Sequence, residues 1–232
     1  MDAHLVQSVD DPNGIWRTRV GEIAALGLLL EPWAGIEKWV LESQIDLLFV
    51  HRPWSLPERL PGNPGVLAYH LAFDERLTVG FNPLLASSLE MTEREVLGLK
   101  SGCPIGMIGN IAQTSASEFT RLLARTFAAE PAALGLPPCC VDRVAIAGAS
   151  WPRLMVEAAR RGADIFVTGT LRAPARSVVN EIGLPVLEFG HRPAELWGLQ
   201  ALARVLRGAF PNVSVQLTPF DLKAESTNHE RM

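Results

Sequence analysis

The sequence predicts an α/β protein with largely parallel sheets, and two observations support this fold class. Short apolar runs alternate along the chain with longer amphipathic stretches, which is the pattern of strands joined by crossover helices. The same order of strand-like blocks also occurs twice. A chain of 232 residues is long enough for one large domain or two small ones, and either can bury a substantial core.

Seven segments are expected to be strands, because each is a short apolar run bounded by polar or turn-forming residues. In chain order they are 22–30, 46–50, 66–73, 144–149, 164–167, 185–189 and 213–217. Six segments have the spacing of amphipathic helices: 33–43, 83–91, 117–128, 152–161, 175–181 and 194–209. Ser115 and Glu118 fit a capping box, while Pro152 and Pro193 suit early helix positions.

The repeat involves three consecutive blocks of strand-like sequence. Four residues of the first block recur at a shift of 141 − 20 = 121, with Val20, Ile23, Ala24 and Gly27 matched by Val141, Val144, Ala145 and Gly148. Residues 42–50 are matched loosely by 157–167, and residues 66–69 by 186–189 at a shift of 186 − 66 = 120. The shared order indicates a duplicated β-α-β-α-β unit. Chance similarity of apolar strands is the alternative.

The repeat sets the expected domain organisation. A first α/β repeat covers residues 1–91, a connecting segment with one helix covers 92–141, a second α/β repeat covers 142–220, and a polar tail covers 221–232. The connecting segment is rich in glycine, with Gly102, Gly106 and Gly109, and it ends in a run of two prolines.

Composition excludes several classes of function. A formal net charge of −4 gives no basic face for phosphate backbones, so nucleic acid is not an expected partner. The apolar run 23–30 ends at Glu31 and is too short to cross a membrane, and the first residues lack a basic signal-peptide region. We therefore expect a cytoplasmic protein. Its cysteines lack zinc-finger spacing and are interpreted as structural or incidental thiols.

Polar residues follow the expected strands of both halves at matching places. Ligands of open parallel sheets collect beyond the carboxyl ends of the strands. In the first half His51 and Arg52 follow the strand 46–50, and His70 and Asp74 close the strand that starts at Val66. In the second half His191 and Glu195 occupy the matching place, and the repeat makes Asp74 and Glu195 counterparts because 195 − 74 = 121.

A mixture of imidazole and carboxylate groups suits a divalent metal such as zinc, iron, manganese or nickel. His191 and Glu195 are four residues apart and would share one face of a helix. The alternative is that His51 and His191 bond to backbone at strand ends, while Asp74 and Glu195 are solvated acids at helix starts. Residue spacing leaves both interpretations open.

Three motifs contain these residues. Residues 46–53, Asp-Leu-Leu-Phe-Val-His-Arg-Pro, are similar to an Asp-Leu-Leu-Ile-Val-His-His-Pro motif, and His70 to Asp74 fit His-x-x-x-Asp. Residues 190–199 fit Gly-His-x-x-x-Glu-x-x-Gly-Leu. In this order the motifs resemble those of the GTP cyclohydrolase 1 type 2 family, also named the NGG-interacting-factor-three-like family.

The resemblance implies two intertwined, duplicated halves in a layered α/β/α arrangement with mixed, largely parallel sheets. It also implies ring-shaped homohexamers and a two-metal site. By resemblance His51 and Asp74 match ligands of one metal, His191 matches a ligand of the other, and Glu195 matches the bridging carboxylate. The family's second histidine is replaced by Arg52, whose protonated guanidinium has no lone pair to donate.

We therefore expect one firmly held metal rather than two, with His51, Asp74 and Glu195 as its ligands. Arg52 would replace the charge of the second ion, pair with Glu195, or contact an anionic substrate. The expected function is a metal-dependent hydrolase of a small molecule, in which the cation makes water more acidic and His70 is a catalytic proton-transfer or supporting group. The alternative is a non-catalytic metal-binding scaffold or regulatory interaction protein.

Overall fold

A computed structural model describes residues 11–219 of the chain, which form two compact units. Within these residues, the first unit consists of 11–73 and 198–219, and the second of 74–197. Each unit contains one main mixed sheet with helices. The predicted α/β class is therefore confirmed. The polar tail 221–232 lies outside the described residues.

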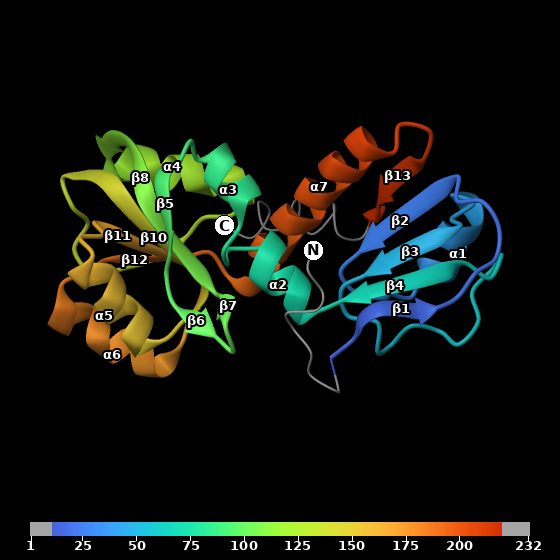
Figure 1. The fold of residues 1–232 in the computed structure, drawn as a ribbon, viewed down its shortest axis with the longest axis horizontal. Coiled ribbons are helices and arrows are strands. Elements are labelled where there is room, and N and C mark those ends of the chain that lie inside the picture. Colours follow the sequence, from blue (N-terminus) through green and yellow to red (C-terminus); the bar gives the residue numbers. More distant parts are fainter. Residues whose placement is uncertain (1–10, 220–232) are drawn as a thin grey trace. The chain divides into compact units, whose positions relative to one another are not determined.

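The first unit has a five-stranded sheet in the order β1-β4-β3-β2-β13 (Figure 1). These strands are β1 (Asn13–Arg17), β2 (Ala25–Leu29), β3 (Leu47–Val50), β4 (Gly65–Tyr69) and β13 (Ser214–Leu217). All pairs are parallel except β1 with β4. Helix α1 (Ile36–Glu42) packs Trp39 and Val40 into the core of this unit. Gly27 makes room for that packing, because a Cβ there would lie 2.6 Å from Cη2 of Trp39.

The second unit has a six-stranded sheet in the order β5-β8-β10-β11-β12-β9. These strands are β5 (Thr92–Val96), β8 (Gly106–Ser115), β9 (Ala132–Leu134), β10 (Cys140–Ser150), β11 (Ile165–Leu171) and β12 (Val186–Glu188). Strands β10, β11 and β12 are parallel, and the other pairs are antiparallel. A small hairpin joins β6 (Leu99–Lys100) to β7 (Cys103–Pro104).

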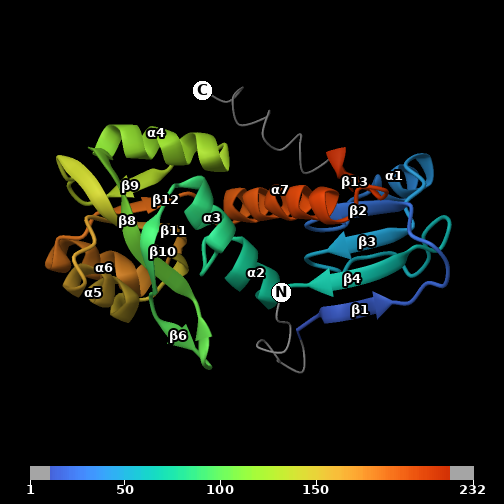
Figure 2. The ribbon, with the colours of Figure 1, turned by 45° about the horizontal axis from the view of Figure 1, so that its top comes forward.

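Helices cover both faces of the second sheet. Helix α4 (Ala116–Phe127) lies on one face, and α5 (Pro152–Arg160) and α6 (Ala173–Ile182) lie on the other (Figures 1 and 2). Helix α3 (Pro83–Ser88) precedes β5, and α7 (His191–Ala209) follows β12. The predicted capping box is confirmed, because Ser115 Oγ accepts from the backbone N–H of Glu118 and the Glu118 side chain accepts from that of Ser115.

All seven predicted strands and all six predicted helices occur, with shifted ends. One prediction was partly wrong, because the strand expected over 66–73 ends at Tyr69 and helix α2 (Leu71–Leu77) follows it. Residues 71–73 are apolar and resemble a continued strand. However, buried Phe73 and Leu77 are four residues apart, which is a helical spacing.

The segment expected to be a connector, 92–141, contains the predicted helix but also strands β5, β8 and β9 of the second sheet. Two of its glycines, Gly106 and Gly109, lie in strand β8. In the structure a Cβ at Gly106 would lie 2.7 Å from the carbonyl oxygen of Ile146, and one at Gly109 would lie 2.6 Å from that of Thr92. These glycines therefore let β8 approach its two neighbouring strands closely.

The duplication stays a prediction, and two structural similarities between the units favour it. Both sheets contain three consecutive parallel strands, β2-β3-β4 and β10-β11-β12, with an antiparallel strand beside the third. Asp46 Oδ2 accepts from Ala24 N and Ala25 N at 2.9 and 3.0 Å. Its counterpart Asp164 accepts from two consecutive backbone N–H groups in the same way, both at 2.9 Å.

No helix in residues 11–219 is long and apolar enough to span a membrane.

Candidate metal centre

The carboxyl ends of the parallel strands in the first unit present the first site residues. His51 and Arg52 directly follow β3, and His70 directly follows β4. The backbone N–H of His51 donates to Leu29 O at 3.1 Å, which aligns the end of β3 with that of β2. This is the edge of a parallel sheet where ligands are expected to bind.

His51 is fully buried, and its hydrogen bond fixes the state of its imidazole. Nδ1 lies 2.9 Å from the carbonyl oxygen of Tyr69. A carbonyl oxygen can only accept, so Nδ1 carries a proton, and in the neutral imidazole Nε2 keeps its lone pair. Ring contacts with Phe73 and His70, at centroid distances of 4.7 and 5.0 Å, hold the imidazole in place. The Nε2 atom therefore has the electronic state of a metal ligand.

His70 is held by the carboxylate of Asp11, which no motif in the sequence indicates. Its Nδ1 lies 2.6 Å from Asp11 Oδ1, while Asp11 Oδ2 accepts from Leu71 N at 3.1 Å. The Asp11 side chain is only 6% exposed. A carboxylate on one imidazole nitrogen orients the ring and makes the other nitrogen a better ligand. Asp11 is 59 residues from His70, and no spacing rule links the two.

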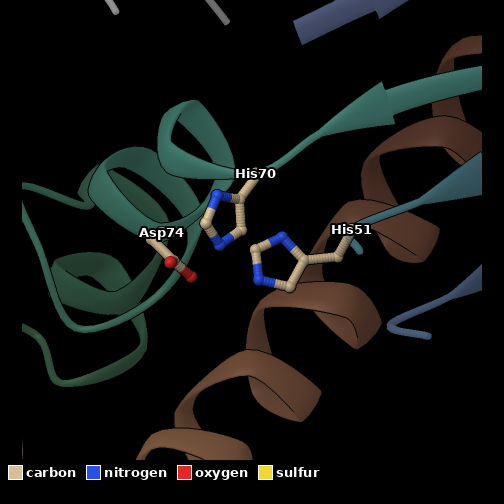
Figure 3. A group of neighbouring side chains, drawn as sticks. All are labelled: His51, His70 and Asp74. Atoms are coloured by element: carbon tan, nitrogen blue, oxygen red, sulfur yellow. The ribbon is translucent and has the colours of Figure 1, made fainter. Parts of the chain in front are cut away.

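Asp74 completes a candidate triad with the two histidines. It lies in the first turn of α2, four residues after His70. Ligand atoms of His51, His70 and Asp74 all lie within 4.8 Å of one another, and Figure 3 shows the three side chains gathered together. Two imidazole nitrogens and one carboxylate oxygen fit zinc, iron, manganese or nickel. These residues therefore fit a divalent metal, and the donor set does not identify the ion.

A second candidate group in the second unit contains Asp74, His191 and Glu195. His191 Nε2 lies 3.1 Å from Glu195 Oε1 and 3.8 Å from Asp74 Oδ2. Glu195 is fully buried, whereas the His191 side chain is 53% exposed. His191 and Glu195 are one turn apart on α7, so they share a face as expected.

The predicted ligands His51, Asp74 and Glu195 do not form one group in the structure. His51 is grouped with His70 and Asp74, while Glu195 is grouped with His191 and Asp74. His70 was expected to transfer protons or support a ligand, yet its position is that of a candidate ligand. Asp74 belongs to both groups.

Arg52 lies beside an acidic residue at the end of the neighbouring strand. Its Nε donates to Glu31 Oε2 at 3.2 Å, and both side chains are partly exposed. A pair this accessible to water contributes little to stability. Its effect is electrostatic, because Glu31 offsets part of the Arg52 charge. A contact of Arg52 with Glu195 or with an anionic substrate stays a prediction.

Two solved structures share this fold. A structure described as protein ybgI, unknown function, superposes with a TM-score of 0.73 at 20% identity, covering 94% of this chain and 92% of that chain. A Bacillus cereus protein related to NIF3 gives a TM-score of 0.71 at 13% identity, covering 93% of this chain and 92% of that chain.

Sequence comparison identifies the family. A Chlamydia trachomatis protein named GTP cyclohydrolase 1 type 2 homolog is 31% identical over 193 residues, covering 76% of this chain and 76% of that protein. The sequence model of the Duf34/NIF3 (NGG1p interacting factor 3) family matches residues 59–226, which is more than half of the chain. The protein therefore belongs to the Duf34/NIF3 family.

Proposed function

We propose that this protein binds a divalent metal through His51, His70 and Asp74 and uses it to hydrolyse a small molecule. The observation that supports the proposal most strongly is the triad with its imidazoles already oriented. Each histidine donates through Nδ1 to a fixed acceptor, a carbonyl for His51 and a carboxylate for His70. Such oriented imidazoles are typical of histidines that bind metals.

Three further side chains suit hydrolysis. A bound divalent cation supplies Lewis acidity, which polarises a substrate oxygen and makes water a stronger nucleophile near neutral pH. When no second ion occupies them, the buried Glu195 can accept a proton and the half-exposed His191 can exchange protons with solvent. Arg52 carries positive charge that suits an anionic group of the substrate.

An aromatic residue offers a second contact for the substrate. Trp54 is 55% exposed, and its ring contacts His70 edge-on at a centroid distance of 5.0 Å. The exposed indole can cover an apolar or planar part of a small molecule next to the metal. The name of the Chlamydia relative makes GTP one substrate to test.

We also propose that one ion is held more firmly than a second. His51 is fully buried, whereas the His191 side chain of the other group is 53% exposed. A ligand buried and fixed in one orientation loses less conformational entropy when the metal binds. The His51, His70 and Asp74 triad is therefore the tighter site, and Asp74, His191 and Glu195 form the weaker one.

A non-catalytic role is the second candidate, and the family's name, NGG1p interacting factor 3, favours it. We further propose the ring-shaped homohexamer that the family resemblance implies. Edge strand β1 supports an association surface, because Ile15 and Trp16 are 73% and 44% exposed. Light scattering of the purified protein measures the oligomeric state.

A substrate panel separates the two functions. Metal-loaded protein is assayed with phosphoesters, nucleotides including GTP, and cyclic amides, beside His51→Gln and a control, Glu37→Gln, at an exposed acid of α1. The hydrolase proposal predicts turnover that His51→Gln abolishes and Glu37→Gln retains. No turnover of any substrate, or equal turnover by His51→Gln, supports the scaffold.

A further inference from the structure

Two exposed thiols lie close together at the start of β10. Cys139 and Cys140 are adjacent and exposed, and their sulfur atoms are 3.6 Å apart. Successive side chains of a regular strand point to opposite faces. The chain bends at Cys139, one residue before β10 begins, and this bend brings both sulfur atoms to the same side.

The distance between the sulfur atoms fits two ligands of one cation. A tetrahedral ion with metal–sulfur bonds of about 2.3 Å holds two thiolates about 3.8 Å apart, which is close to the observed 3.6 Å. A disulfide is less suited to this position, because bonded cysteines usually have Cα atoms at least about 4.4 Å apart. Adjacent residues across a trans peptide have Cα atoms only about 3.8 Å apart.

One polar side chain contacts the pair. Gln113 Nε2 donates a hydrogen bond to Cys140 Sγ at 3.7 Å. Two carboxylates lie near this end of β10, because Asp142 follows Cys140 by two residues and its backbone N–H donates to Asp164 Oδ2 at 2.9 Å. Their negative charge favours a cation.

There is room beside Cys139 for further ligands. Cys139 lines an open cavity of about 580 Å³, together with Ser115, Ser117, Pro137 and Leu187. Water can enter this space and fill the coordination positions that two sulfur atoms leave open. The site is therefore suited to an exchangeable ion rather than to a fully enclosed structural zinc.

We propose that Cys139 and Cys140 bind one thiophilic divalent cation, of the zinc or cadmium class, through both sulfur atoms. Thiolates prefer such ions to magnesium or calcium. The site shares no residue with the triad of His51, His70 and Asp74, so it does not depend on the proposed function.

Cadmium titration of the reduced full-length protein tests the site. Thiolate-bound Cd²⁺ gives an ultraviolet charge-transfer band that imidazole and carboxylate ligands do not give. We expect the band to saturate at one equivalent of Cd²⁺ per chain. Cys139→Ser and Cys140→Ser should each weaken binding about a hundredfold, because the second sulfur acts at a high effective concentration. The double variant should lose the band.

Two matched variants serve as controls. Cys103→Ala removes the third cysteine, which is buried in another part of the second unit, and should keep the band. The double variant His51→Gln/His70→Gln removes the histidine site and should keep it too. Circular dichroism checks that each variant is folded. A band that survives in Cys139→Ser/Cys140→Ser, or single serine variants that bind Cd²⁺ within a few-fold of wild type, would overturn the proposal.

Discussion

Replacing Asp11 by Asn changes one atom of a side chain that holds His70 and the first turn of α2 together. The carboxylate uses one oxygen for His70 Nδ1 at 2.6 Å and the other for Leu71 N at 3.1 Å. Asn replaces one of these two oxygens by an NH₂ group, so the donor that faces this group loses its acceptor. If its NH₂ group faces His70, the imidazole proton must move to Nε2, and that atom no longer has a lone pair for a metal.

We expect Asp11→Asn to weaken metal binding by about 10- to 100-fold, the usual effect of losing such a supporting carboxylate. This corresponds to about 1.4–2.7 kcal/mol. Isothermal titration of Zn²⁺ into metal-free protein measures the change. Loss of the bond to Leu71 N should also reduce stability by about 0.5–2 kcal/mol, which urea unfolding reports.

The matched control is Ser115→Ala, which removes the cap of α4 in the second unit. It should cause a similar loss of stability, about 0.5–2 kcal/mol, with unchanged Zn²⁺ affinity. If Asp11→Asn binds Zn²⁺ within twofold of wild type, or if Ser115→Ala weakens Zn²⁺ binding equally, Asp11 does not position His70 for a metal.

Other parts of the structure give three further predictions. Gly27→Ala should destabilise the protein by about 1–3 kcal/mol, because the new methyl group would clash with Trp39. In contrast, Gly208→Ala in α7 should stabilise the protein by up to about 1 kcal/mol, because the added Cβ would have no neighbour within 4 Å. Thermal unfolding compares the two variants. Hydrogen bonds from the backbone N–H groups of Ala24 and Ala25 lower the pKa of Asp46 in the folded state. The Asp46 carboxylate therefore contributes its full stabilisation above the unfolded-state pKa, and this stabilisation is lost as the pH falls through the lower folded-state pKa. Urea unfolding at a series of acidic pH values should therefore show a flatter pH dependence for Asp46→Asn, and an unchanged slope contradicts this role. His191→Ala should remove only the weaker metal, and Zn²⁺ titration should still find the tight site.

Much of the fold could be predicted from local sequence, because apolar periodicity directly reflects which faces are buried. Helix α2 was missed because Leu71 to Phe73 continue the apolar run of β4, and the carboxylate that caps the helix comes from Asp11, far away in the sequence. Strand β8 was missed because glycines usually indicate turns, whereas Gly106 and Gly109 here allow close contact between strands.

The candidate site was predictable in its residues but not in their grouping. Positions near the ends of expected strands indicated His51, His70 and Asp74, and a four-residue spacing indicated His191 with Glu195. The partners of these residues depend on contacts distant in sequence. Asp11 reaches His70 across 59 positions, and Glu31 reaches Arg52 across 21, so neither leaves a local signal.

The most direct test of the metal centre is elemental analysis of protein purified without a histidine tag. We predict one equivalent of a divalent transition metal per chain. Wild type and His191→Ala should retain this metal through dialysis, whereas His51→Gln and His70→Gln should each lose it. Metal retained by the double variant His51→Gln/His70→Gln, or two equivalents that are lost together in His191→Ala, would contradict the proposed site.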